Sequence, residues 1–420
     1  MRPQTLLPIL IGVAVGAAGV LHGLKLERAA KSEDAAELRT TISSLEEQVA
    51  MLERENESLR SLAQGGGELK VPAPLIEFAE KAAGLDFRST PVVHRLAGEE
   101  LLERVAASIE SRFPPNSLDH REAAWAKMGL LAPDDRFAGQ VAATYSLGAR
   151  SWFDDQTGEA WVTDRFDESS VPDQSALLRA LVRILLHQHY PPAPGYAGDE
   201  ADRARTALHH GTAISIETRF LARQALGIGF TGTQDRSEAA DLLNNLPVYI
   251  RGLATFPSQL GAAVAGRLME QEKLLEALHQ PPTTTARFAP DLDGIEARAI
   301  ELPASNDEPV LEETAGWLGL KLWLETLDPA LAVHADGWRG DRYQLTARSD
   351  TQLDLVWDIE LADAATAEAV ARAGCAMAGF LAGSDRDANP DEVIKTPEGD
   401  RISITRPTET RVRFTHLGPE

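Results

Sequence analysis

Residues 177–190 read LLRALVRILLHQHY, and residues 207–213 read ALHHGTA. Apolar side chains recur at spacings of three and four around both segments, which predicts two consecutive helices at residues 176–190 and 201–227. These helices hold a concentration of basic side chains. They are Arg179, Arg183, His187, His189, His209 and His210. This part of the chain is therefore the first place to look for a functional site.

Length, charge and cysteine content limit the possible classes of protein. The chain has 420 residues, enough for two or three domains, and its 43% hydrophobic and 25% charged residues are ordinary for a globular protein. A formal net charge of −23 disfavours a nucleic-acid partner, because phosphates are neutralised by Lys and Arg. The single cysteine, Cys375, excludes an intramolecular disulfide and a zinc site built on cysteines.

The N-terminus predicts a membrane anchor. Residues 5–24 read TLLPILIGVAVGAAGVLHGL, with no formal charge over a length that spans about 30 Å as a helix. The alternative is a cleaved signal peptide, but no clean A-x-A site is visible and a charged stretch starts at Lys25. We therefore expect an uncleaved transmembrane helix within residues 1–26. The flanking charges do not decide its orientation.

A coiled-coil stalk is expected at residues 27–63. Leu, Ile and Val alternate at spacings of four and three from Leu38 to Leu59, with β-branched residues at a and Leu at d, which favours a parallel homodimer. Asn56 falls at an a position, where it sets register and a two-stranded state. A lone amphipathic helix packed on its own domain is the alternative. The glycines and prolines of residues 64–74 then predict a linker.

The remaining chain predicts an α+β fold that is mainly helical, with short β-hairpins. A helical domain is expected at residues 75–300, and a C-terminal α/β extension packed on it at residues 301–420. Besides the two helices above, helices are expected at residues 75–84, 99–111, 237–246, 256–279, 311–326 and 364–381. Strands are expected at residues 152–162, 343–359, 402–405 and 412–415.

Several local patterns follow one another in a particular order. They are Phe153-Asp154 with Thr157-Gly158; His187-Gln188-His189-Tyr190; ALHHGTA at residues 207–213; Pro247, Ile250, Leu253, Phe256-Pro257 and Gly261; Pro281-Pro282-Thr283-Thr284-Thr285 with Ala289-Pro290; and GWRGDRY at residues 337–343. Together they resemble a family of exported or membrane-anchored bacterial metallopeptidases of the HExxH type. The resemblance implies a zincin-like fold and a single-pass membrane protein whose soluble domain lies outside the cytoplasm.

The sequence departs from this family at the positions that hold the zinc ligands and the catalytic base. The HExxH positions, residues 179–183, read RALVR, and the third-ligand position holds His210. Zinc hydrolysis needs neutral imidazoles one turn apart and a carboxylate base. Arg179 and Arg183 are permanently cationic, and Ala180 cannot accept a proton. The pattern therefore indicates a pseudoenzyme with no catalytic residues, no metal and no cofactor.

Two uses remain for the basic side chains. Arg179 and Arg183, with His210 nearby, could hold a carboxylate of a bound peptide or of an internal Asp or Glu. Alternatively, His187 or His189 with His209 or His210, and Glu217, could form a non-standard metal site. The paired histidines on each helix diverge too much to chelate together.

We therefore expect a membrane-anchored, dimeric, catalytically inactive peptidase-like protein that binds a protein or peptide. The alternative is a metal-dependent hydrolase with a non-standard histidine site.

Overall fold

A computed structural model describes residues 45, 49, 67–146, 151–164, 166–193, 195–225, 243–289, 292, 294–304, 307–349, 352–384 and 388–419. The chain divides into two units, Met1–Gly67 and Glu68–Glu420. The expected anchor lies outside the described residues, as does the expected stalk apart from Leu45 and Val49. Both of these residues are helical, and both side chains are exposed. The coiled-coil dimer stays a prediction.

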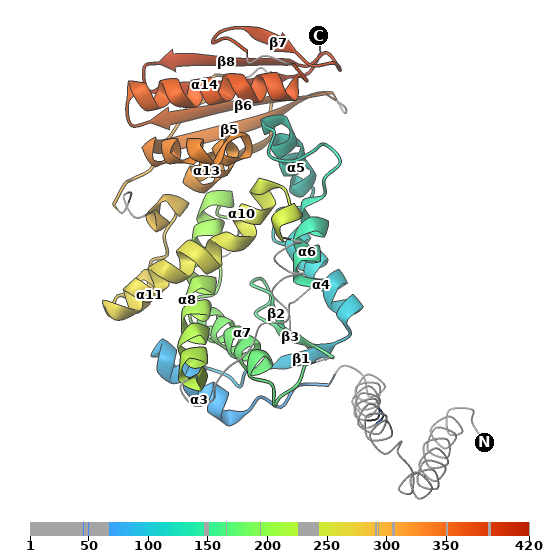
Figure 1. The fold of residues 1–420 in the computed structure, drawn as a ribbon, viewed down its shortest axis with the longest axis vertical. Coiled ribbons are helices and arrows are strands. Elements are labelled where there is room, and N and C mark those ends of the chain that lie inside the picture. Colours follow the sequence, from blue (N-terminus) through green and yellow to red (C-terminus); the bar gives the residue numbers. More distant parts are fainter. Residues whose placement is uncertain are drawn as a thin grey trace, which may run out of the picture. The chain divides into compact units, whose positions relative to one another are not determined.

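Two long helices form the centre of the helical part of the second unit (Figure 1). Helix α7 (Val171–His189) begins at Ser170, whose hydroxyl accepts a hydrogen bond from the Asp173 amide, and has Pro172 in its first turn. It packs along α8 (Asp199–Ala225). A Cβ at Gly211 of α8 would overlap the backbone of Gly261, so glycine lets the next helical layer approach closely.

The other helices surround this pair. They are α3 (Ala73–Ala83), α4 (Gly98–Ser111), α5 (Ser117–Met128), α6 (Phe137–Ser146), α10 (Val248–Phe256), the π-helical turn Pro257–Gly261, α11 (Ala262–Glu270), α12 (Leu274–His279) and the 3-10 turn Thr285–Phe288. The turn Pro257–Gly261 and α11 lie along α8, and α3 packs on α7.

A small sheet covers one side of α7. Strand β3 (Ala160–Thr163) lies between β1 (Val93–Leu96), to which it is parallel, and β2 (Ser151–Phe153), to which it is antiparallel. The β2–β3 hairpin confirms the two short strands expected at residues 152–162. In its turn, residues 154–159, Asp155 contacts Arg183 of α7.

The C-terminal part is built on a six-stranded antiparallel sheet. Its strands follow the order β4 (Pro309–Glu313), β5 (Trp338–Ser349), β6 (Gln352–Leu361), β9 (Arg411–Leu417), β8 (Arg401–Thr408) and β7 (Val393–Lys395). Helices α13 (Gly316–Leu327) and α14 (Ala364–Leu381) pack on the sheet, as Figure 1 shows. The Trp323 ring makes T-shaped contacts with Trp357 and Phe414 there, at centroid distances of 5.3 and 6.0 Å.

The expected fold class is therefore wrong. A mainly helical, zincin-like domain with only short hairpins does not describe a molecule that contains this sheet. The hairpin at residues 343–359 was recognised because β5 and β6 are adjacent in sequence. The pairing of β6 with β9, Leu355↔His416 to Glu360↔Arg411, joins residues 51 to 61 positions apart, and no local turn signal reports it.

The expected transmembrane helix is not part of the described structure. None of the helices in the described part of the chain is both long and apolar enough to cross a membrane.

Candidate functional site

The predicted site residues Arg179, Arg183 and His210 lie where α7 and α8 pack together. The two arginines are one turn apart on α7, and His210 belongs to α8. Burial, and then the positive charges of Arg183 and Arg179, lower the pKa of His210 well below its usual value. The structure therefore brings these three side chains together, with the imidazole uncharged at neutral pH.

Each arginine already has a carboxylate partner within the domain. Arg183 is buried and donates from Nη2 to Oδ2 of Asp155 at 2.5 Å. Arg179 Nε pairs with Glu217 Oε2 at 3.1 Å. These guanidinium groups hold internal acids rather than facing an empty site, which is one of the two arrangements that the sequence left open.

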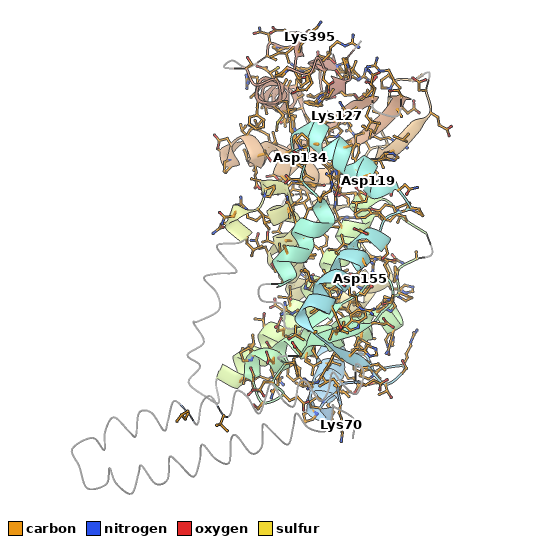
Figure 2. All side chains as sticks on the ribbon, turned by 90° about the vertical axis from the view of Figure 1, so that its right-hand side faces the viewer. Lys70, Asp119, Lys127, Asp134, Asp155 and Lys395 are labelled. Atoms are coloured by element: carbon orange, nitrogen blue, oxygen red, sulfur yellow. The ribbon has the colours of Figure 1, made fainter. Side chains whose placement is uncertain are left out.

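Asp155 is the central acid of this region, and Figure 2 labels it among the side chains of the helical part. It lies in the β2–β3 turn. Although burial opposes its ionisation, the charges of Arg183, Arg205 and Arg112 hold the pKa of Asp155 well below its usual value. Sequence reasoning missed this residue. The available signal was the Asp-Asp pair in a turn next to a helix that carries arginines.

Two of the four histidines come close together beside Asp155. Burial lowers the pKa of His187, and burial followed by the charge of Arg205 lowers the pKa of His209 to about 3. Among the described residues, the Nε2 atoms of both rings are buried and lack a hydrogen-bond partner. Both imidazoles are therefore neutral at pH 7, and each has one unused nitrogen.

The other histidines do not complete a metal site with them. His189 makes a 2.8 Å hydrogen bond from Nε2 to the carbonyl oxygen of Asp86, at the end of α7. In the described part of the chain, no three His, Cys, Asp or Glu side chains are grouped so that they could hold a metal ion. The charges of Arg183 and Arg205 beside His187 and His209 also disfavour a cation at this place.

A pocket of about 800 Å³ opens next to this region, and we call it the Arg205 pocket. Aromatic, proline and leucine side chains form much of its wall: Phe113, Tyr190, Pro191, Pro192, Tyr196, Leu278, Pro281 and Pro282. Its floor is formed by one face of α8, because Ala201, Arg205 and His209 follow one another at spacings of four residues. Arg112 and Asp202 complete the floor.

Two buried polar atoms on the floor of the Arg205 pocket have no hydrogen-bond partner within the described structure. Arg112 donates from Nε to Oδ2 of Asp202 at 2.5 Å and from Nη2 to the hydroxyl of Thr206 at 2.7 Å. Arg205 Nη2 lies 3.6 Å from Oδ1 of the same Asp202, too far for a hydrogen bond. Within the described structure this nitrogen is buried and has no acceptor, like His209 Nε2. Sequence reasoning missed Arg112 and Arg205, since the walls of the pocket come from four separate segments.

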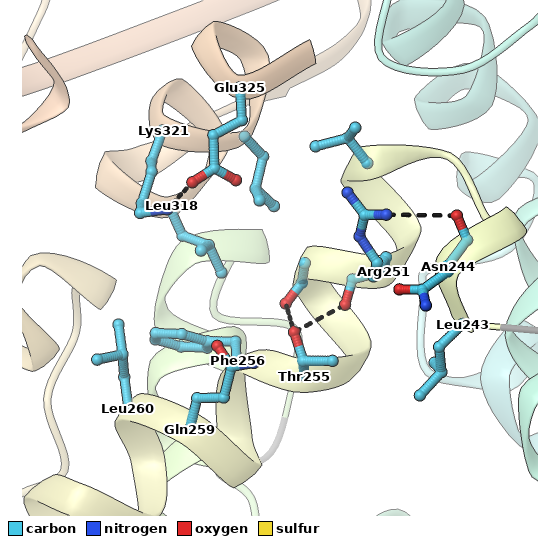
Figure 3. Close-up of a pocket in the computed structure, with 13 residues that line it drawn as sticks. Leu243, Asn244, Arg251, Thr255, Phe256, Gln259, Leu260, Leu318, Lys321 and Glu325 are labelled. Atoms are coloured by element: carbon cyan, nitrogen blue, oxygen red, sulfur yellow. Dashed lines mark hydrogen bonds and ion pairs between the residues drawn. The ribbon is translucent and has the colours of Figure 1, made fainter. Parts of the chain in front are cut away.

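A second pocket, of about 440 Å³, lies between α10, the π-helical turn Pro257–Gly261 and α13 (Figure 3). Several of its polar groups already bind one another. Lys321 pairs with Glu325, and the Arg251 guanidinium donates to the carbonyl oxygen of Asn244 at 3.4 Å. This pocket offers a ligand fewer unused polar atoms than the Arg205 pocket, so we do not take it as the candidate site.

A buried ionic network joins the helices to the sheet and has a structural role. Arg121 and Asp199 are each 1% exposed, and Arg121 Nε lies 2.7 Å from Asp199 Oδ1. The same guanidinium also contacts Glu313 of β4. Burial raises the pKa of Glu313 to about 7. The network therefore links α5, α8 and the edge of the sheet through one arginine.

Glu200 lies beside this network. Its Oε1 atom accepts hydrogen bonds from the Thr284 hydroxyl at 2.8 Å and from the amide and hydroxyl of Thr285 at 2.6 and 2.7 Å. Burial raises the pKa of Glu200 to about 7. An acid with all its acceptor bonds on one oxygen can carry a proton on the other, which matches the raised pKa.

Comparison with known proteins identifies only the C-terminal part. A family described as a domain of unknown function (DUF8575) matches residues 306–420, the segment that contains the six-stranded sheet with α13 and α14. No curated protein and no solved structure matches the chain. The Arg205 pocket lies outside the matched segment. The resemblance to HExxH-type metallopeptidases stays a prediction.

Proposed function

We propose that the unit Glu68–Glu420 is a non-catalytic binding module that holds a segment of a peptide or protein in the Arg205 pocket. One observation carries the proposal: Arg205 Nη2 and His209 Nε2 are buried at the pocket floor without hydrogen-bond partners among the described residues. Leaving a buried polar atom unsatisfied costs about 1–3 kcal/mol. A ligand that bonds to both atoms would recover this free energy.

The size and lining of the Arg205 pocket support a peptide ligand. Its volume of about 800 Å³ lies within the range of known ligand sites, about 300–1,000 Å³. Aromatic rings and prolines offer an apolar wall to a side chain, while the floor offers polar groups. An amphipathic segment of a few residues satisfies both requirements.

The absence of catalysis is proposed from the residues at the motif positions. A zinc peptidase needs imidazoles and a carboxylate base, whereas this chain has Arg179, Ala180 and Arg183. The two guanidinium groups are held by Asp155 and Glu217. The alternative, a metal-dependent hydrolase, would need at least three grouped ligands, and no three His, Cys, Asp or Glu side chains are grouped in this way in the described part of the chain.

Affinity selection tests the binding function. The full-length chain is mixed with a synthetic library of random heptapeptides with free C-termini, and the retained peptides are identified by mass spectrometry. Their dissociation constants are then measured for the wild type and for Ala201→Trp, which fills the pocket from α8. The matched control is Ala365→Trp, an exposed position on α14.

We expect Ala201→Trp to weaken the affinity for the selected peptides by at least tenfold and Ala365→Trp to leave this affinity unchanged. The proposed function is wrong if no peptide is retained, or if both variants bind the retained peptides as tightly as the wild type does.

A further inference from the structure

We propose that the Arg205 pocket selects its ligand through a carboxylate group, which Arg205 and His209 bind together. This inference rests on the proposed function, and it adds the chemical class of the group that anchors the ligand.

Within the described structure, Arg205 has a buried Nη2 atom without a hydrogen-bond acceptor. Arg183 has Asp155 at 2.5 Å, and Arg112 has Asp202 at 2.5 Å. Arg205 shares Asp202 with Arg112 and stays 3.6 Å from it, although its side chain is only 14% exposed. A buried guanidinium is stabilised by a carboxylate that accepts its hydrogen bonds in the plane of the group. The unpaired Nη2 atom of Arg205, a residue that lines the pocket, therefore fits a carboxylate from a ligand.

His209 supplies a second hydrogen-bonding group, one turn further along α8. The ring is 3% exposed, and burial together with the charge of Arg205 keeps it neutral at pH 7. In the tautomer with the proton on Nε2, this nitrogen donates to an oxygen bound in the pocket. The two residues thus offer two donors and a single positive charge.

That combination favours a monoanion over a phosphate group. A phosphate carries a charge of about −1.5 to −2 at pH 7 and three strong acceptor oxygens, and it is usually bound by several cations. Here the neighbouring Arg112 is engaged by Asp202 and Thr206. The negative charge of Asp202 would also repel a dianion more strongly than a carboxylate.

The apolar wall indicates where the rest of the ligand lies. Phe113, Tyr196 and Pro282 are among the residues that line the same pocket. A carboxylate next to an apolar group occurs at the C-terminus of a peptide and also at an internal Asp or Glu with apolar neighbours. The chemistry is the same in both cases, so the experiment must separate the two sources.

The test uses each peptide retained in the selection described above, synthesised in three forms. The first is the free acid, the second has an amidated C-terminus, and the third has every Asp and Glu replaced by Asn and Gln. Dissociation constants are measured by calorimetry for the full-length wild type, Arg205→Gln, Arg205→Lys and His209→Gln. The control Arg372→Gln removes one exposed arginine of α14, so it matches the charge change without touching the pocket.

We expect one neutralised form to bind the wild type at least tenfold more weakly, and the identity of that form names the source of the carboxylate. Arg205→Gln should weaken the acid form to the level of the neutral form and leave the neutral form unchanged. Arg205→Lys should restore part of the affinity, because it keeps the charge but not the planar donors. His209→Gln should have a smaller effect, and Arg372→Gln should have none.

The inference is overturned if all three forms bind the wild type equally, or if Arg205→Gln weakens the acid and neutral forms by the same factor. It is also overturned if inorganic phosphate displaces the peptides at lower concentration than acetate does. In each of these cases, loss of binding in Ala201→Trp would still support the binding function. Failure of Ala201→Trp to weaken binding would remove both proposals.

Discussion

The Nη2 atom of Arg183 lies 2.5 Å from Oδ2 of Asp155, and this buried pair ties α7 to the β2–β3 turn. Arg205 and Arg112 also interact with Asp155. Removing the carboxylate would leave three guanidinium groups close together with one acid fewer. The pair therefore explains how α7 can bury the guanidinium group of Arg183.

Asp155→Asn should destabilise the protein strongly. Breaking a buried ion pair on one side costs about 3–5 kcal/mol, because the remaining charge stays buried without its partner. Urea unfolding of the full-length chain measures the change in the free energy of unfolding. The control is Glu368→Gln, which breaks the exposed pair of Arg372 and Glu368 and should cost less than about 1 kcal/mol. Equal losses in the two variants would contradict a special role for Asp155.

The sequence allowed α7 and α8 to be predicted because their signals are local. Apolar spacing locates both helices, and the positions of Arg179, Arg183 and His210 on them follow from helical geometry. The acids that hold the arginines could not be assigned in the same way. Asp155 comes from a turn, and its approach to Arg183 depends on how the small sheet packs against α7.

The Arg205 pocket could not be fully predicted from the sequence for the same reason. The spacing of Ala201, Arg205 and His209 was visible in the sequence, but the wall of the pocket was not. Phe113, Tyr190 and Pro282 come from segments that meet only in the folded chain. The six-stranded sheet was missed for a related reason, because the pairings of β4 with β5 and of β6 with β9 join strands that are far apart in the sequence.

The pKa of Glu200 makes the stability of the protein depend on pH. The folded-state value of about 7 exceeds the ordinary value of 4.5, so the folded state binds the proton more tightly than the unfolded chain does. The stabilisation that Glu200 contributes is therefore present at low pH, and it is lost as the pH rises from about 4.5 through 7. A shift of this size corresponds to about 3 kcal/mol.

Glu200→Gln removes this titration and isolates its effect. The free energy of unfolding of the variant, minus that of the wild type, should increase as the pH rises from 4.5 to 8. Urea unfolding at several pH values measures this difference. Glu276→Gln, at an exposed position on helix α12, serves as the control. A difference that does not change with pH would show that Glu200 stays ionised.

His209 should have the opposite pH dependence. Its folded-state pKa of about 3 lies below the ordinary value of 6.5, so the unfolded chain binds the proton more readily. The stability contributed by the neutral ring is therefore present above pH 6.5 and is lost as the pH falls toward 3. Between pH 6.5 and 5 this loss amounts to about 2 kcal/mol.

Between pH 6.5 and 5, the free energy of unfolding of His209→Gln should fall by about 2 kcal/mol less than that of the wild type. The measurement is the free energy of unfolding at pH 7, 6 and 5 for both proteins. The pKa of His209 can also be followed directly by NMR of the imidazole. A ring that titrates near 6.5 in the folded state would contradict the buried, neutral His209 that the proposed carboxylate site requires.

Gly316 is the position where backbone conformation and close packing act together. Its φ angle is +76°, and a Cβ there would overlap the carboxylate of Glu200. Gly84 has a similar φ of +70°, but its Cβ would meet nothing within 4 Å. Gly84→Ala should therefore cost about 1–2 kcal/mol, the penalty of the left-handed conformation alone. Gly316→Ala should cost at least about 2 kcal/mol more, because Glu200 would have to leave Thr284 and Thr285. Thermal unfolding of the two variants compares the costs, and a Gly316→Ala protein as stable as Gly84→Ala would show that Glu200 can move aside without loss.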